Sequence, residues 1–296
     1  MTTLSAKPVV IPAPDRGADL HVRVTAPATG TGLPLILLSH GFGESLDSYD
    51  PLVDHWTAHG FAVVQPTHLD SRTLALPPED PRTPLIWRHR VADLTRVLDA
   101  LDEVEAAVPG LTGRIDRARI AVAGHSYGAQ TAGVLLGARV LDASGVPGED
   151  LSDHRVRAGV LLAATGLGGA DLSPFAAEHF PFMSPSFAEL TTPALVVAGD
   201  ADQSALTATR GPDWFTDAFH HAPGATHLLT LVGGEHTLGG IQGRGAAATT
   251  DENPERVAAI ARLTTAYLLG ALGGDDAAWT VESSALDAAI GWVKGR

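Results

Sequence analysis

The chain of 296 residues is long enough for one large α/β domain, and its 45% hydrophobic and 18% charged residues are typical of a globular protein. Twenty Lys and Arg against 34 Asp and Glu leave a formal net charge of −14, which disfavours nucleic acids and anionic membrane surfaces as partners. The chain has no cysteine, so disulfides, thiolate metal sites and a cysteine nucleophile are excluded.

The N-terminal segment lacks the basic stretch and apolar run of a secretion signal, and no apolar run approaches the ~20 residues of a membrane-crossing helix. We therefore expect a cytoplasmic protein, or a secreted one if a signal peptide has been removed. We expect residues 1–296 to form a single domain, with residues 1–8 and 244–252 as flexible segments. The sequence leaves the oligomeric state open.

Short apolar runs that predict strands alternate along the chain with stretches of helical periodicity. In chain order we expect strands at 21–26 and 34–39, a helix at 48–60, a strand at 61–66, a helix at 85–107, a strand at 120–123, a helix at 129–140, strands at 156–164, 194–198 and 227–232, and helices at 254–272 and about 281–293. This alternation predicts a mostly parallel sheet with helices on both faces, in which ligands bind beyond the carboxyl ends of the strands.

The sharpest motif is Gly124-His125-Ser126-Tyr127-Gly128, a G-x-S-x-G that follows a predicted strand and opens a predicted helix. Glycines on both sides leave room for a tight strand-to-helix turn that lifts the Ser126 hydroxyl clear of the sheet. The motif therefore predicts a nucleophilic serine. The structural alternative is a serine that caps the helix between two packing glycines.

A nucleophilic serine requires a base, and the base requires a partner that fixes its tautomer. In chains with this turn the acid and the histidine follow the serine in that order, on loops after later strands. His236 fits the base because it lies in a Gly-rich loop directly beyond the last predicted strand. Three other histidines near that strand remain competitors: His220, His221 and His227.

For the acid, Asp202 is preferred over Asp200, because the position three residues past Gly199 clears the end of the strand. We expect one of these two aspartates to cap the loop instead. Asp171 is a third, more distant candidate.

The Gly-rich stretch at 38–43, LSHGFG, follows an early buried strand and predicts an oxyanion hole. The backbone N–H groups of Phe42 and Tyr127 are the expected donors. His40 is interpreted as a buried histidine that braces this loop. The alternative is an ordinary turn between a strand and a helix.

The motifs LSHGFG, GHSYG, GDAD and GGEH, in that order, resemble the α/β-hydrolase superfamily over residues 34–240. The resemblance implies an α/β-hydrolase fold with a central sheet of about eight strands and no large lid domain. It is closest to the branch that holds dienelactone hydrolases, chlorophyllase-like enzymes, platelet-activating-factor acetylhydrolases and cutinase-like polyester hydrolases.

Three departures from that branch matter. Dienelactone hydrolases use a cysteine nucleophile, which this chain lacks. The acetylhydrolases place their acid just after the strand that follows the nucleophile helix, where this chain has no acid at 163–166. Secreted cutinase-like enzymes usually carry disulfides and a signal peptide, so their absence argues against an extracellular polymer as the natural substrate.

Aromatic residues make up only 5% of the chain, so their positions are informative. We expect an apolar pocket where the loops before and after Asp202 project over the strand ends, although some of these side chains will only pack the loops down. The expected pocket residues are Phe180, Phe182, Met183 and Trp214.

Apart from Arg210, these loops offer no cation that could hold a carboxylate. The charged turn Arg88-His89-Arg90 with Asp93 is interpreted as an i,i+3 pair on a solvated helix face rather than a substrate clamp. No HExxH pattern, phosphate loop or dinucleotide glycine pattern occurs, so no metal and no cofactor are expected.

These features together predict a serine carboxylic-ester hydrolase that acts on neutral, hydrophobic esters, either small molecules or polymers. Acyl transfer, thioester cleavage and amide cleavage by the same three residues are alternatives. A non-catalytic protein of the same fold that binds a hydrophobic ligand is the alternative from another class.

Overall fold

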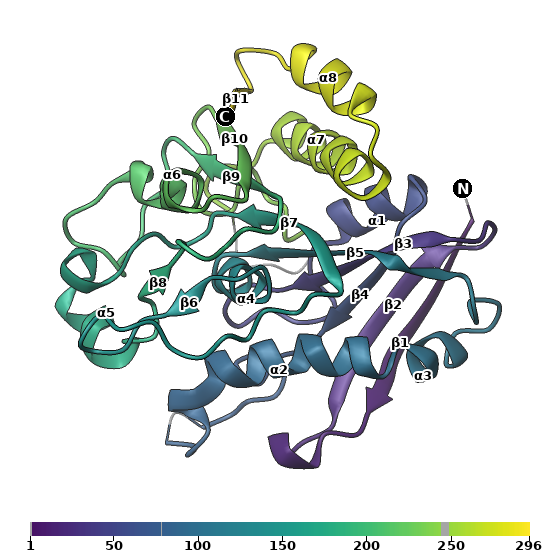
Figure 1. The fold of residues 1–296 in the computed structure, drawn as a ribbon, viewed down its shortest axis with the longest axis horizontal. Coiled ribbons are helices and arrows are strands. Elements are labelled where there is room, and N and C mark those ends of the chain that lie inside the picture. Colours follow the sequence, from purple (N-terminus) through teal and green to yellow (C-terminus); the bar gives the residue numbers. More distant parts are fainter. Residues whose placement is uncertain (1, 78, 244–248) are drawn as a thin grey trace.

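The computed structural model describes residues 2–77, 79–243 and 249–296, and a large sheet runs through its middle (Figure 1). The strands of this sheet are β1 (Thr3–Ile11), β2 (Leu20–Pro27), β3 (Leu33–Ser39), β4 (Ala62–Pro66), β5 (Ile115–His125), β7 (Val156–Leu162), β9 (Ala194–Gly199), β10 (Ala225–Leu231) and β11 (Gly291–Gly295). Their order across the sheet is β1-β2-β4-β3-β5-β7-β9-β10-β11. The pairs from β4 to β10 are parallel, and antiparallel pairs close both edges.

Helices cover both faces of this sheet. In Figure 1, α1 (Asp50–Ala58) and α7 (Pro254–Gly273) lie above the sheet and pack against each other, whereas α2 (Ile86–Asp99) lies below it and packs against α4 (Tyr127–Leu135). Every residue of β3 and β9 is buried as a result, which is why these strands read as continuous apolar runs. The predicted fold class is confirmed.

The remaining elements are short. They are α3 (Leu101–Ala106), α5 (Pro174–His179), α6 (Asp217–His221), α8 (Ala277–Ser284) and a separate two-stranded ribbon of β6 (Arg139–Val140) and β8 (Pro185–Ser186). The connection from β7 to β9 contains only a short 3₁₀ turn, α5 and β8, so no large separate domain stands over the strand ends in the described part of the chain.

The apolar core has two parts. The larger part fills the space between the sheet and its helices. A smaller cluster lies beside the start of α4 and is formed by Leu69, Ile86, Tyr127, Phe182 and Met183. This second cluster brings together segments that are far apart in the sequence, and it forms one wall of the cavity described below.

Most predicted elements are confirmed, but the edges of the sheet are not as expected. The prediction of a helix at about 281–293 is wrong, because the end of α8, a turn and β11 occupy that stretch. The Asp287 carboxylate accepts the Ala289 amide at 2.8 Å in this turn, which breaks the helical path. Residues 1–8, predicted to be flexible, instead contain most of β1, which pairs with β2. In the described part of the chain, the sheet therefore has nine strands rather than about eight.

Two predicted helices have different bounds in the structure. The stretch 85–107 is divided at Ala100 between α2 and α3, and the helix predicted at 129–140 begins at Tyr127 and ends at Leu135. The predicted flexible segment 244–252 lies partly outside the described residues, which leave out 244–248. No helix among the described residues is both long and apolar enough to span a membrane.

Candidate active site

Ser126 occupies the tight turn between β5 and α4, in a backbone conformation that side-chain-bearing residues rarely adopt (φ 56°, ψ −120°). A Cβ atom on Gly124 would lie 2.0 Å from the Gly128 carbonyl oxygen, and one on Gly128 would lie 2.0 Å from the Ser39 carbonyl oxygen. The two glycines of the motif are therefore required by space. Ser126 stands at the N-cap of α4 but makes no capping hydrogen bond, which argues against the structural alternative.

The structure brings the three predicted catalytic side chains together. His236 Nε2 lies 2.8 Å from Ser126 Oγ, and His236 Nδ1 lies 3.0 Å from Asp202 Oδ2. A carboxylate only accepts hydrogen bonds, so the proton of a neutral His236 sits on Nδ1 and leaves Nε2 free to accept the serine hydroxyl. The geometry is that of a nucleophile, a general base and an orienting acid.

Burial differs along this chain of side chains. Asp202 is completely buried, whereas the His236 side chain is 38% exposed. Burial raises the pKa of the Asp202 carboxyl, and the hydrogen bond from His236 opposes that rise. The Asp202 carboxylate is thus held in a poorly solvated position beside the His236 ring.

The other acid candidates are engaged elsewhere. Asp200 accepts the Gly233 amide at 2.7 Å, the loop-capping role predicted for one of the two aspartates. Asp171 pairs with Arg210 at 2.8 Å. The competing histidines were His220, His221 and His227. Among the described residues, none of these three makes a hydrogen bond to Ser126.

The amide groups of the Gly-rich loop have different partners. The Gly41 amide donates to Tyr49 Oη at 2.9 Å, and the Gly43 amide donates to Asp70 at 3.4 Å. The Phe42 amide has no acceptor in the part of the chain that the structure describes, and neither has the amide of Tyr127, the first residue of α4. Both residues line the cavity that contains Ser126, which is the position expected of oxyanion donors.

A buried ion pair supports this loop from behind. Arg90 Nη1 lies 2.6 Å from Asp70 Oδ1, and Arg90 also donates to the His40 carbonyl oxygen. The guanidinium lies 4.3 Å from the centre of the Tyr127 ring. His40 donates from Nδ1 to the Gly41 carbonyl at 2.7 Å, in keeping with the predicted bracing role. Burial and Arg90 lower the pKa of His40 to about 4, so this imidazole is neutral.

The interpretation of Arg90 and Asp93 as a solvated i,i+3 pair is therefore wrong. Both side chains are completely buried, because the face of α2 that carries them packs against α4 and the Gly-rich loop. Asp93 pairs with Arg16 at 2.8 Å instead of with Arg90. Helical spacing alone could not reveal this, since it does not say which face of α2 lies inside.

A second Ser-His-Asp arrangement lies in the core. His68 Nδ1 is 2.9 Å from Asp93 Oδ2, and His68 Nε2 is 3.0 Å from Ser39 Oγ. All three side chains are at most 1% exposed, so no substrate carbonyl can reach the Ser39 hydroxyl. Burial lowers the pKa of His68 well below its usual value, which further disfavours proton uptake. Access distinguishes Ser126 from this buried group.

Ser126 opens into a cavity of about 710 Å³. Of the predicted pocket residues, Phe180, Phe182 and Met183 line it, and the Phe182 ring stacks on Tyr127 at 5.6 Å. Thr165, Ile86 and Leu206 also contribute to the apolar and neutral part of the wall. No motif signals these three residues, because they come from separate segments that only the fold brings together.

The prediction that Trp214 lines the pocket is wrong. Trp214 is completely buried in the main core, and its Nε1 donates to the Leu167 carbonyl at 2.8 Å. It lies in a 3₁₀ helix (Pro212–Thr216) that places its side chain in the core. The ring of its neighbour Phe215 packs against the His236 ring, with 5.5 Å between the two ring centres.

The loop that carries His236 is held by two residues that no motif reveals. The Asp251 carboxylate accepts the amides of Glu235 at 2.8 Å and of Gly239 at 2.9 Å, on either side of His236. Arg256 lies 3.0 Å from the same carboxylate and donates to the backbone before the loop. Both charged side chains are buried, so this pair fixes the loop onto the start of α7.

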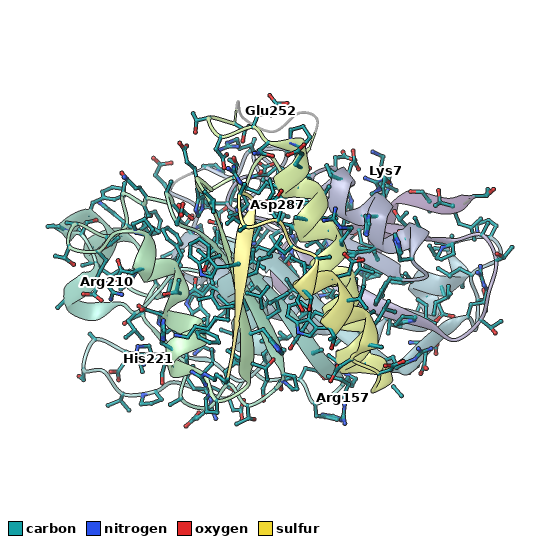
Figure 2. All side chains as sticks on the ribbon, turned by 90° about the horizontal axis from the view of Figure 1, so that it is seen from above. Lys7, Arg157, Arg210, His221, Glu252 and Asp287 are labelled. Carbon is teal, nitrogen blue, oxygen red and sulfur yellow. The ribbon has the colours of Figure 1, made fainter. Side chains whose placement is uncertain are left out.

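Arg210, the one cation considered for an anionic substrate, is already neutralised. It pairs with three carboxylates in the loop region at the left of Figure 2: Asp171, Asp213 and Asp217. Within the described ranges, no group of three or more His, Cys, Asp or Glu side chains is arranged to hold a metal ion.

The sequence itself matches a family model described as the alpha/beta hydrolase family over residues 35–293. The chain belongs to this family. The match begins in β3 and ends in β11, so it includes the nucleophile turn, both later loops and the closing helices. Membership supports a hydrolase-type function for the chain, and the fold agrees with it.

Proposed function

We propose that this alpha/beta hydrolase cleaves carboxylic esters with Ser126 as nucleophile and an acyl-enzyme as intermediate. One observation carries the proposal: Ser126, which lines the cavity, has its Oγ 2.8 Å from His236 Nε2, and the other ring nitrogen of His236 lies 3.0 Å from the buried Asp202. Serine esters of this kind form without a cofactor.

In the first half-reaction, Ser126 Oγ attacks the ester carbonyl carbon while His236 Nε2 takes the hydroxyl proton. The carbonyl electron pair moves onto oxygen, and the amides of Phe42 and Tyr127 bind the resulting oxyanion. Asp202 stabilises the imidazolium. When the tetrahedral intermediate collapses, the bond to the alcohol oxygen breaks and His236 returns the proton to the leaving alcohol.

Water completes the cycle. His236 removes a proton from a water molecule, whose oxygen attacks the acyl carbon of the Ser126 ester. The same two amides bind the second oxyanion, and His236 then protonates Ser126 Oγ as the carboxylic acid leaves. The hydroxyl and the neutral imidazole are restored together.

The lining of the cavity favours neutral, hydrophobic esters, whether small or polymeric. Its aromatic and aliphatic wall suits an apolar acyl or alcohol group. No Lys or Arg is among its described lining residues. Of the four acidic residues there, Asp70 pairs with Arg90 and Asp80 with Arg82, so Glu79 and Glu178 supply the negative charge. A substrate with a second carboxylate would therefore meet like charge.

Within the family, we place the chain near the cutinase-like, chlorophyllase-like and dienelactone hydrolase branch. The connection from β7 to β9 has the six-residue α5 as its longest helix, and this lack of a large lid supports the placement. The serine nucleophile and the acid after β9 distinguish the chain from dienelactone hydrolases and from the acetylhydrolases, respectively.

Covalent labelling tests the proposal directly. A fluorophosphonate should add one adduct to the wild type and none to Ser126→Ala, and the variant should lose turnover of p-nitrophenyl esters. Esters of increasing acyl length measure the size of the pocket, and hemisuccinate esters should react more slowly than neutral ones. Absence of an adduct on folded wild-type protein would contradict the proposal and favour a non-catalytic ligand-binding protein.

Product analysis separates hydrolysis from its alternatives. With an added alcohol, the proposal predicts the free acid as the main product. A new ester as the main product would assign the chain to acyl transfer, and faster turnover of matched thioesters or amides would assign it to those substrates.

A further inference from the structure

A buried chain of hydrogen bonds connects the three parts of the candidate active site. The Gly41 amide lies 2.9 Å from Tyr49 Oη, Tyr49 Oη lies 2.9 Å from His125 Nδ1, and His125 Nε2 lies 2.8 Å from the His236 carbonyl oxygen. The chain thus starts in the oxyanion loop, passes the residue before Ser126 and ends on the backbone of the general base.

Donors and acceptors in this chain can be assigned from chemistry alone. The His236 carbonyl only accepts, so His125 carries its proton on Nε2 and donates it there. His125 Nδ1 is then an acceptor, and the Tyr49 hydroxyl donates to it. The Tyr49 oxygen in turn accepts the Gly41 amide. Each of the three hydrogen bonds therefore has one donor, one acceptor and one proton.

Both side chains are held rigidly in the interior. Tyr49 is completely buried and His125 is 2% exposed. Burial and the neighbouring His236 lower the pKa of His125 to about 3, so this imidazole stays neutral and keeps its tautomer. The Tyr49 amide also donates to the Gln242 carbonyl at 2.8 Å, which ties the tyrosine to the segment after the His236 loop.

We propose that His125 and Tyr49 are positioning residues that hold the oxyanion loop and the His236 backbone in fixed register with Ser126. One arm, from Tyr49 to the Gly41 amide, sets the position of the adjacent Phe42 amide. The other arm, from His125 Nε2 to the His236 carbonyl, sets the position of the base. This inference rests on the proposed esterase function and adds residues that touch neither substrate nor reacting atoms.

Two substitutions at the same position separate the arms. His125→Gln keeps an N–H near the Nε2 position and loses the acceptor at Nδ1, so it breaks the oxyanion-loop arm. His125→Asn keeps an acceptor near Nδ1 and loses the donor at Nε2, so it breaks the His236 arm. Tyr49→Phe breaks the oxyanion-loop arm a second way, from the other end of the same hydrogen bond.

The two arms can be distinguished by the leaving group of the ester. His236 must protonate an ethanol leaving group, whereas p-nitrophenolate leaves without that proton. The assay compares ethyl butyrate with p-nitrophenyl butyrate, and kcat and kcat/KM are expressed per site titrated with a fluorophosphonate. The two esters form the same butyryl-enzyme, so the ratio of their rates is taken from kcat/KM, which reports acylation. A misplaced oxyanion loop slows both esters equally, while a misplaced base slows the ethyl ester more.

We expect His125→Gln and Tyr49→Phe to lower kcat for both esters by about ten- to a hundredfold, with KM nearly unchanged. The variant that combines His125→Gln with Tyr49→Phe should be no slower than either single variant, because each substitution removes the same hydrogen bond. For His125→Asn, the ratio of ethyl to p-nitrophenyl ester rates should fall by about tenfold below that of the wild type.

Circular dichroism and thermal unfolding show whether each variant folds. If His125→Gln does not fold, Tyr49→Phe still tests the oxyanion-loop arm. Variants that fold less stably but keep kcat within about twofold and keep the ester ratio would overturn the inference, since a purely structural role predicts that result. If the wild type itself takes no fluorophosphonate adduct, the proposed function fails first, which is a distinct outcome.

Discussion

Gly128→Ala perturbs the site through a single methyl group. A Cβ atom at this position would lie 2.0 Å from the Ser39 carbonyl oxygen and 2.7 Å from the His40 carbonyl oxygen. Both atoms belong to the backbone where β3 enters the oxyanion loop, so no flexible side chain can move aside. Gly133 provides a control on the same helix, because a Cβ atom there would first meet the Ala138 Cβ at 3.8 Å, an ordinary contact.

The size of the effect follows from these distances. An ordinary contact begins near 3.4 Å, so the loop or α4 must shift by about 1.4 Å to admit the methyl group. A displacement of about 1 Å in a catalytic group can lower the rate by about a hundredfold. We therefore expect Gly128→Ala to reduce kcat/KM by at least about a hundredfold, together with a loss of about 1–3 kcal/mol in the free energy of unfolding.

The assay is hydrolysis of a short p-nitrophenyl ester, with the rate of fluorophosphonate labelling as a second readout and urea denaturation for stability. Gly133→Ala should retain full activity and gain up to about 1 kcal/mol, because alanine favours the helix more than glycine does. A fully active Gly128→Ala, or equal losses in the two variants, would refute the argument from close packing.

Three further predictions concern charges. Asp202→Asn should lower kcat by about 10⁴-fold while Asp200→Asn stays near the wild type, because only Asp202 holds the Nδ1–H of the base; equal losses in steady-state kinetics would contradict this. Burial lowers the pKa of His125 from 6.5 to about 3, so below pH 6.5 the unfolded chain binds a proton that the folded protein does not, and acid destabilises the fold. His125→Asn should therefore flatten the pH dependence of the free energy of unfolding by about 1.4 kcal/mol per pH unit near pH 5–6; parallel curves in urea denaturation would argue otherwise. Asp251→Asn leaves the buried Arg256 without its charge partner and should cost about 3 kcal/mol and slow labelling of the nucleophile; unchanged thermal unfolding would disprove that role.

The parts of the site that the sequence predicts are those set by local geometry. The turn around Ser126 needs glycines within two residues on either side, so its signature is contiguous and readable. The same holds for the stretch at 38–43 and for the loops that follow β9 and β10, because in a parallel sheet the ends of successive strands meet at one edge. Strand order then brings Asp202 and His236 to the serine.

The wrong predictions concern which way a side chain faces and where the edges of the sheet lie. Helical spacing places Arg90 and Asp93 on one face of α2 but does not say that α4 and the oxyanion loop cover that face. Trp214 lies in a loop of the right region, yet a 3₁₀ turn directs it into the core. The edge strands β1 and β11 are half exposed, so they lack the continuous apolar pattern of the central strands.

The sequence by itself therefore determined the fold class, the nucleophile turn and the candidates for base and acid, since each depends on residues that are neighbours in the chain or follow strands in a fixed order. The tertiary structure alone decided that Asp202 rather than Asp200 meets His236, that Ser39 is inaccessible, and that Tyr49 and His125 join the oxyanion loop to the base. These facts depend on distances between segments that are far apart in the chain. Only packing of the whole domain sets such distances.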